Sequence, residues 1–193
     1  MENTQNAYQF ILELNKLKLV FRNTLTNKER SESTAEHSWS AAMIIVVLMS
    51  ELKKEFTAID ELKAVKLALI HDIVEIYAGD VIAFDAQARK DKHAVELDAL
   101  EKLMQLNPIF GEQLHALWHE FENKSSIEAK IAKAADAICP VFVRLHSKQS
   151  YIPAAISLEK FDKTKAPSFE FSKTFSALYQ QLKLDLQAND LIG

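Results

Sequence analysis

Apolar positions spaced three and four residues apart recur along the chain, and this spacing is typical of amphipathic α-helices. A first helix is predicted over residues 6–20, where the spacing runs through Phe10, Leu14 and Leu17. The next stretch, residues 22–34, is polar and has no such period. It is therefore predicted to be a loop.

A second helix is predicted from about residue 34 to residue 54. Ser33 and Glu36 form a capping-box pattern, in which the two side chains bind each other's backbone N–H groups at a helix start. An apolar run over residues 41–49 follows, too short for a membrane span of about 20 residues. We expect one stripe of this helix to face the core, namely Trp39, Met43, Ile44 and Val47.

Further helices are predicted in the rest of the chain. Asp60 is expected to cap a third helix that ends at Gly79, because glycine suits the left-handed residue after a helix end. The helix pattern then recurs over four stretches: residues 93–106, 111–123, 126–147 and 168–188. We expect the third of these to bend or break at Pro140, and residues 151–167 to form a loop.

Composition supports a helical chain. Only 3 glycines and 4 prolines occur in 193 residues, which leaves little material for hairpin turns or linkers. We therefore expect an all-α bundle of about six or seven helices, with residues 1–193 forming a single domain. One cysteine, Cys139, excludes an intrachain disulfide and suits a reducing compartment. No signal-peptide pattern is visible, so a cytoplasmic protein is expected.

Several polar residues lie where an apolar helix has no packing reason for them. His71 and Asp72 are adjacent within an apolar stretch, and Glu75 follows at a spacing that places all three on one helix face. His37 lies near the start of the second predicted helix, and Asp136 lies in an alanine-rich stretch. Burying such groups unpaired would cost several kcal/mol, so a bound metal ion is one candidate explanation.

The two histidines and two aspartates make a mixed nitrogen and oxygen donor set. Such a set suits Mn, Co, Fe, Ni, Zn or Mg, and it does not select one of them. Four protein ligands would also leave positions for water and substrate. From the residues alone, hydrogen-bonded core or capping residues are an equally good explanation.

A family resemblance favours the metal site. His37, the pair His71-Asp72, and Asp136 occur in the order that marks the HD-domain superfamily of metal-dependent phosphohydrolases. The stretches "LKLVFRN", "ESTAEHSW", "HDIVEIYAGD" and "KAADAI" resemble, more narrowly, the small bacterial 5'-deoxynucleotidases and their relatives. This similarity covers roughly residues 8–150.

The resemblance implies roles for individual residues. One divalent metal ion would be held by His37, His71, Asp72 and Asp136. Glu75 would handle the attacking water and Arg22 would orient the phosphate. The implied substrate-binding positions are Arg22, Asn23, Asp72, Asp80, Val81, Ile82, Ala83 and Asp136. Without the resemblance, Arg22 is interpreted as a solvated charge and Asp80 as a turn residue.

The implied reaction is hydrolysis of (deoxy)nucleoside 5'-monophosphates to nucleoside and phosphate. One position departs from the characterised deoxynucleotidases, because Asn23 stands where they have tryptophan. Ile76 follows Glu75, whereas related guanosine tetraphosphate hydrolases have a second acid there. The position three after Asp72 is Glu75 instead of histidine, which favours one metal ion over two.

Other functions stay open from the sequence. They are a phosphodiesterase or triphosphohydrolase acting on small nucleotides, and a non-catalytic nucleotide-binding module. His115 and His119 are spaced for a metal but are expected to be surface residues. The expected partners are a small nucleotide and, by resemblance, a second copy of the chain. The net charge of −4 argues against a nucleic-acid polymer, and no membrane association is expected.

Overall fold

The computed structural model describes residues 2–80 and 91–193, apart from the side chain of Glu2. These residues are mostly helical, and the predicted all-α class is confirmed, with more helices than the six or seven expected. The α-helices are α1 Glu2–Leu14, α2 Thr34–Glu55, α3 Glu61–Ile70, α4 Glu75–Ala78, α5 Lys92–Leu106, α6 Pro108–Asn123, α7 Ile127–Ser147, α8 Leu158–Lys165 and α9 Lys173–Ala188. Short 3₁₀-helices span Asn15–Leu19, Ile152–Ala154 and Ala166–Ser168.

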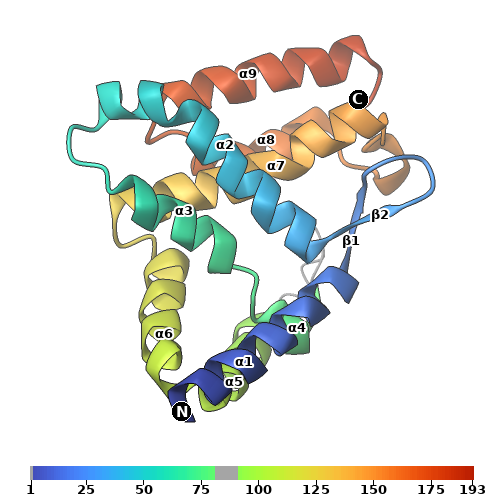
Figure 1. The fold of residues 1–193 in the computed structure, drawn as a ribbon. Helices are drawn as coiled ribbons and strands as arrows, with labels where there is room; N and C mark the ends of the chain where they lie inside the picture. Colours follow the sequence, from blue (N-terminus) through green and yellow to red (C-terminus); the bar gives the residue numbers. More distant parts are fainter. Residues whose placement is uncertain (1, 81–90) are drawn as a thin grey trace.

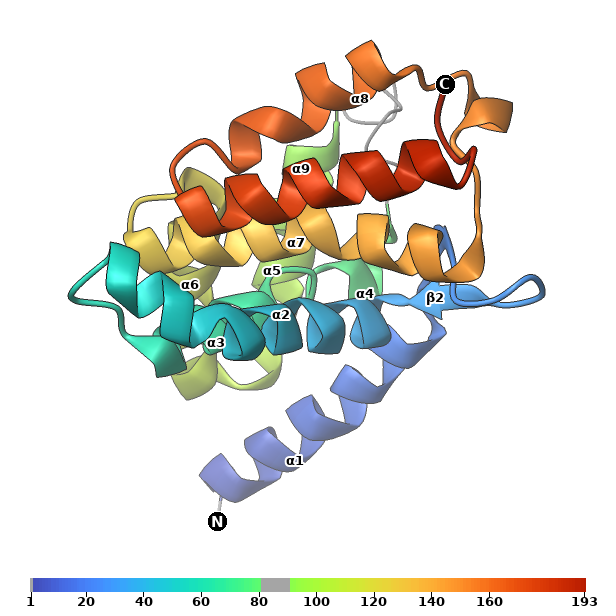
Figure 2. The same cartoon turned by 90° about the horizontal axis from the view of Figure 1, so that it is seen from above.

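Two groups of helices enclose two clusters of buried side chains. Helices α2, α3 and α7 pack against one another, and α9 packs on α7 and α2 (Figures 1 and 2). Helices α1, α4, α5 and α6 surround the smaller cluster, in which Leu103 and Trp118 are almost completely buried. The segment between α3 and α4 joins the two groups, and it carries the His71-Asp72 pair. This pair therefore lies where both groups of helices meet.

Residues 21–33 form a β-hairpin, so the predicted loop is wrong. Strand β1, Phe21–Leu25, pairs antiparallel with β2, Ser31–Ser33. The Asn27 side chain accepts hydrogen bonds from the backbone N–H groups of Glu29 and Arg30, which stabilises the turn. The strands are too short and too polar to show an alternating apolar pattern.

Helix α2 begins as its capping box predicts. The Ser33 hydroxyl accepts a hydrogen bond from the backbone N–H of Glu36, and the Glu36 carboxylate accepts one from the backbone N–H of Ser33. The predicted core stripe, in contrast, is wrong for Trp39, Met43 and Val47, whereas Ile44 packs against the core. Trp39 and Val47 are 62% and 70% exposed. The buried face carries Ala41, Ala42, Ile45, Met49 and Leu52. Because the run is apolar on nearly every side, its period could not identify the covered face.

The third predicted helix is divided in two. Asp60 caps α3 as expected, but α3 ends at Ile70. The backbone then tightens, because the N–H of Ile73 bonds to the carbonyl of Ile70 and the N–H of Glu75 bonds to that of Asp72. Bonds over three residues place side chains three apart on the same side. Asp72 and Glu75 consequently face the same direction.

Three further elements complete the comparison with the sequence. Gly79 ends α4 with a φ of +74°, as expected for a glycine at this position. Helix α7 runs without a break across Pro140. Residues 151–167 contain α8 instead of the predicted loop. Among the helices that the structure describes, none is long and apolar enough to cross a membrane.

Candidate metal centre

Four side chains from three parts of the fold converge on one point. His37 comes from the first turns of α2, His71 and Asp72 follow α3, and Asp136 lies in the middle of α7. Their ligand atoms, the two histidine Nε2 atoms and one oxygen of each aspartate, all lie within 4.8 Å of one another. The structure thus brings together all four residues that the sequence nominated as metal ligands.

The distances between these atoms suit a metal ion. His37 Nε2 lies 3.1 Å from Asp136 Oδ1, and His71 Nε2 lies 3.1 Å from Asp72 Oδ2. The two crossed pairs, His37 to Asp72 and His71 to Asp136, are both 3.7 Å apart. Ligands bound about 2.1 Å from one ion at tetrahedral or octahedral angles lie roughly 3.0–3.4 Å apart. Small side-chain adjustments would therefore let all four bind one ion.

The His71 ring is oriented for this purpose. Its Nδ1 lies 2.8 Å from the Ala68 carbonyl oxygen, so this nitrogen carries a proton and donates it to the backbone. Its Nε2 is buried and has no hydrogen-bond partner within the described part of the chain. It lies 3.1 Å from Asp72 Oδ2 without forming a hydrogen bond to it. A metal ion bound by both groups would satisfy this nitrogen, whereas packing of the His71 ring would not.

Arg22 lies beside the four ligands, surrounded by acids. Its Nη1 is 2.9 Å from Asp72 Oδ2, 3.2 Å from Asp80 Oδ1 and 3.9 Å from Glu75 Oε1. The side chain of Arg22 is only 14% exposed, so it is not a solvated charge. The neighbouring carboxylates raise the pKa of its guanidinium although burial alone would lower it. Arg22 therefore keeps its positive charge next to the candidate metal.

Glu75 is held at the same place by the start of α2. The Thr34 hydroxyl donates a 2.8 Å hydrogen bond to Glu75 Oε2, and both side chains are buried. Burial, together with the charge of Asp72, raises the pKa of Glu75 to about 9. A nearby divalent cation would favour the ionised form of this carboxyl group.

Burial and neighbouring charges shift the pKa values of the four candidate ligands in different directions. Burial alone would lower the pKa of His71, but the carboxylates of Asp72 and Asp136 raise it to about 10. Burial and the charge of Arg22 lower the pKa of His37. Burial would raise the pKa values of both aspartates, yet the histidines hold them below their usual range. More acids than bases meet here, and this excess of negative charge suits a divalent cation.

The other nominated residues have mixed outcomes. Asp80 lies near the cluster through its contact with Arg22. The side chain of Asn23 is exposed, and the backbone carbonyl oxygen of Asn23 accepts a hydrogen bond from the side-chain amide of Gln149. Val81, Ile82 and Ala83 lie outside the described residues. The substrate-binding role of all these positions stays a prediction.

Several other residues singled out by their chemistry lie outside the candidate centre. Arg30 pairs with Glu36 through both terminal nitrogens, and Cys139 is buried. His115 is exposed, and its ring lies against that of His119. Neither histidine belongs to a group of possible metal ligands within the part of the chain that the structure describes.

Sequence reasoning missed three residues beside the centre. Thr34 donates a hydrogen bond to Glu75. Glu32 is almost completely buried near Arg22 and His37. The positive charge of Lys92 acts to lower the pKa values of Glu96 and Asp80. Thr34 and Glu32 lie within the stretch "ESTAEHSW", where only the histidine was assigned a role in the metal site. A polar residue flanking a candidate ligand was the available signal.

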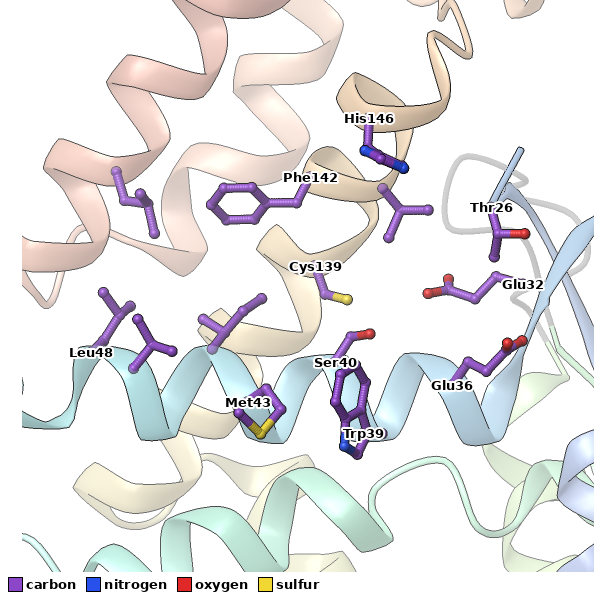
Figure 3. Close-up of a pocket in the computed structure, with 14 residues that line it drawn as sticks. Thr26, Glu32, Glu36, Trp39, Ser40, Met43, Leu48, Cys139, Phe142 and His146 are labelled. Atoms are coloured by element: carbon purple, nitrogen blue, oxygen red, sulfur yellow. The ribbon is translucent and has the colours of Figure 1, made fainter. Parts of the chain in front are cut away.

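A separate apolar hollow of about 690 Å³ lies between α2 and α7. Figure 3 shows Trp39, Met43 and Leu48 of α2 on one side, and Cys139, Phe142 and His146 of α7 on the other. The acids Glu32 and Glu36 lie at the end of the hollow nearest the hairpin. The exposed stripe of α2 thus forms one wall of this hollow.

Comparison with known proteins agrees with this fold. Residues 14–175 match the family model described as HD domain. The chain therefore belongs to the HD domain family. Over 189 residues it is 30% identical to the 5'-deoxynucleotidase HDDC2 of Bos taurus, covering 96% of this chain and 88% of that protein.

Two further relatives place the chain more narrowly. It is 30% identical over 135 residues to the 5'-deoxynucleotidase YfbR of Escherichia coli, covering 67% of this chain and 68% of the relative. Among solved structures, a predicted metal-dependent phosphohydrolase from Magnetospirillum magnetotacticum has a TM-score of 0.85 and 30% identity, covering 97% of this chain and 94% of that one. The chain is therefore similar to named deoxynucleotidases along most of its length.

Proposed function

We propose that this protein is a metal-dependent phosphohydrolase that converts (deoxy)nucleoside 5'-monophosphates to nucleoside and phosphate. The observation that carries the proposal is the convergence of four metal-ligand atoms beside the buried Arg22 and Glu75. The names of the relatives support the choice of a nucleotide substrate.

Each residue has a defined part in this reaction. His37, His71, Asp72 and Asp136 would hold one divalent ion, which lowers the pKa of a bound water and polarises a phosphoryl oxygen. Arg22 offers a planar guanidinium for the phosphate oxygens, which replace part of its contact with Asp72 and Asp80. Glu75, oriented by Thr34, accepts a proton from the attacking water. Asp80, whose Oδ1 lies 3.2 Å from Arg22 Nη1, would contact the nucleoside side of the substrate.

Phosphate release from a panel of nucleotides tests this proposal. The protein is stripped of metal and resupplied with Mn, Co, Ni, Fe, Zn or Mg, one at a time. Ribo- and deoxynucleoside 5'-monophosphates are compared with 3'-monophosphates, cyclic nucleotides and triphosphates. We expect release that depends on the metal and is confined to the 5'-monophosphates. Turnover of only cyclic nucleotides or triphosphates would instead identify a diesterase or a triphosphohydrolase, and binding without turnover would identify a nucleotide-binding module.

Two variants separate metal binding from chemistry. Glu75→Ala should retain the metal and lose roughly 10²–10⁴-fold in rate, because only the water-handling carboxyl group is removed. Asp72→Ala should lose both metal and activity, because Asp72 is a ligand and a partner of Arg22. Full activity of Glu75→Ala would show that the role assigned to Glu75 is wrong.

The preference for the sugar is a separate part of the proposal. Asn23 follows Arg22 in β1 and has an exposed side chain, so a bulky ring does not limit the space at this position. We expect the protein to accept ribonucleotides as well as deoxynucleotides. The ratio of kcat/KM for the two sugars, measured for the wild type and for Asn23→Trp, tests this expectation.

We further propose that the active form is a homodimer in the cytoplasm. Trp39, Met43 and Val47 are exposed along α2, and aromatic residues and methionine are enriched at protein interfaces. A second copy of the chain would cover this apolar surface, which borders the hollow in Figure 3. Light scattering of Val47→Glu should give a monomer, whereas Val95→Glu, at an exposed valine on α5, should leave the mass unchanged.

A further inference from the structure

The carboxyl group of Glu32 lies between two functional residues. Glu32 is in β2, and its side chain is 2% exposed. Its Oε2 lies 3.8 Å from Arg22 Nε and 3.9 Å from His37 Nδ1. Figure 3 shows the same carboxyl group directed from the hairpin toward α7. It therefore contacts the side of each residue that faces away from the candidate metal.

All three atoms are buried without a hydrogen bond. Arg22 Nε, Glu32 Oε2 and His37 Nδ1 have no hydrogen-bond partner within the described residues. A buried polar atom without a partner costs about 1–3 kcal/mol, and more when it is charged. The three atoms complement one another, because a carboxylate oxygen accepts from both N–H groups. A shortening of less than 1 Å, or one bridging water, would satisfy all of them.

A metal ion at His37 determines which nitrogen carries the proton. His37 Nε2 points to Asp136 and Asp72, so binding a metal there requires the proton on Nδ1. For His71 the corresponding nitrogen faces the Ala68 carbonyl oxygen. For His37 the acceptor facing Nδ1 is Glu32. Either protonation state of Glu32 offers an acceptor oxygen.

We propose that Glu32 is a positioning residue, which fixes His37 in its metal-binding tautomer and holds Arg22 by its Nε. This inference rests on the proposed function only for the role of Arg22. Glu32 touches neither the metal nor the substrate, and it acts through the two residues beside it. Hydrogen bonds to metal-ligating histidines typically change metal affinity by 10–100-fold.

A second metal site at this position is the competing interpretation. Glu32, His37 and Cys139 also lie within 4.8 Å of one another. However, burial raises the pKa of the Cys139 thiol far above its usual range. A thiol binds metal only as the thiolate, so this group is a poor metal site. A positioning role for Glu32 explains the geometry without a second ion.

Titration of the metal-stripped protein with Co²⁺ tests the proposal. Calorimetry and the visible absorption of Co²⁺ give the dissociation constant without any substrate. We expect Glu32→Ala to weaken Co²⁺ binding by about 10–100-fold, and Glu32→Gln, which keeps the shape and an acceptor oxygen but loses the negative charge, to weaken it less, though by more than about twofold. The control is Glu29→Gln, at an exposed position in the same hairpin, which should bind as the wild type does.

The thermal midpoint and the kinetics of the variants distinguish a positioning role of Glu32 from a purely structural one. Without metal, Glu32→Gln should unfold at the wild-type temperature or above, because it removes the charge of a buried carboxyl group whose Oε2 has no hydrogen bond within the described residues. At saturating Co²⁺ the KM of Glu32→Gln for the nucleotide should rise about tenfold above that of the wild type. Its kcat should change little, because the substitution affects Arg22 and not Glu75. Even if Glu32→Ala fails to fold, Glu32→Gln still decides the question.

The outcomes separate this inference from the proposed function. A Co²⁺ dissociation constant for Glu32→Gln and for any folded Glu32→Ala within twofold of wild type would overturn the role of Glu32. A weakening that Glu29→Gln reproduces would overturn it too. If the wild type binds Co²⁺ but releases no phosphate from any nucleotide, the proposed function fails, and the comparison of dissociation constants still tests Glu32.

Discussion

His71 illustrates how one residue can couple metal binding to proton release. In the metal-free protein its pKa is raised to about 10, above the ordinary value of 6.5, by the carboxylates of Asp72 and Asp136. His71 is therefore protonated at pH 7, and a metal ion has to displace the proton from Nε2.

We predict that metal binding at pH 7 releases about one proton from His71, and that affinity increases as the pH rises toward 10. The sign follows because protons and the metal compete for the same nitrogen, and fewer protons bind at higher pH. Calorimetric titration with Co²⁺ in two buffers of different ionisation enthalpy counts the protons released. An identical apparent enthalpy in both buffers would contradict the prediction.

A second prediction concerns the hydroxyl group that orients Glu75. Thr34→Val keeps the shape of the side chain but removes the donor to Glu75 Oε2. We expect the rate to fall about tenfold, because one hydrogen bond to a reacting carboxyl group is lost, while Co²⁺ affinity stays unchanged. Thr26→Val, at a hydroxyl in the turn of the hairpin, is the matched control. A variant with the wild-type rate would show that Thr34 does not orient the base.

At the residue scale, the sequence identified the four residues that meet in the candidate metal centre, but it missed residues that lie beside them. Polar residues inside apolar helices stand out, which is why His71, Asp72 and Asp136 could be found. Glu32 and Thr34 stand in a polar stretch, where their position near a candidate ligand is a signal but the residue types do not distinguish a buried side chain from a solvated one. Their surroundings come from distant segments as well as near ones, because Thr34 bonds to Glu75 and β1, which pairs with the strand of Glu32, packs against α7.

At the element scale, the close approach of α6 to α5 depends on Gly111. A Cβ atom added there would lie 2.8 Å from the Cα of Met104 and 2.9 Å from its carbonyl oxygen. Alanine is the better helix former, but these neighbours are backbone atoms of α5, which cannot turn aside as a side chain can.

We therefore predict that Gly111→Ala lowers the free energy of unfolding by about 1–3 kcal/mol, because α6 has to move away from α5. Denaturation with urea measures this change. Gln113→Ala, at an exposed position on the same helix, should change stability by no more than about 0.5 kcal/mol. Equal or greater stability of Gly111→Ala would mean that the helix pair adjusts without cost.

Helix positions were predictable where a cap or an apolar period marked them. Ser33 and Asp60 were correctly identified as capping residues. The division between α3 and α4 was not predicted, because the apolar pattern continues through it and only the tertiary contacts of His71 and Asp72 favour the tighter backbone. Helix α8 was missed because its segment is mostly polar, with Phe161 as its fully buried apolar residue.

At the scale of the whole molecule, the metal ligands connect distant parts of the chain. His37 lies in α2, His71 follows α3 and Asp136 lies in α7, so one ion would join three elements of the larger core. A ligand that binds only the folded state stabilises it by an amount that grows with its concentration.

We predict that a metal at 100 times its dissociation constant stabilises the protein by about 2.7 kcal/mol, and that chelation reverses the effect. Differential scanning calorimetry with and without Co²⁺ measures it. A single cooperative transition would also agree with the expected single domain, which stays a prediction. Asp72→Ala should show no shift with Co²⁺, and a shift as large as that of the wild type would place the ion elsewhere.

The carboxyl groups around Arg22 also predict the order in which metal and nucleotide bind. Asp72, Glu75 and Asp80 surround its guanidinium, and a nucleoside monophosphate brings further negative charge to the same place. Like charges repel strongly where water is scarce, so, with Arg22 binding the phosphate as proposed, we expect the cation to bind before the nucleotide. With this order of binding, the concentration of free divalent metal in the cell limits the fraction of the protein that is active, at any concentration of nucleotide.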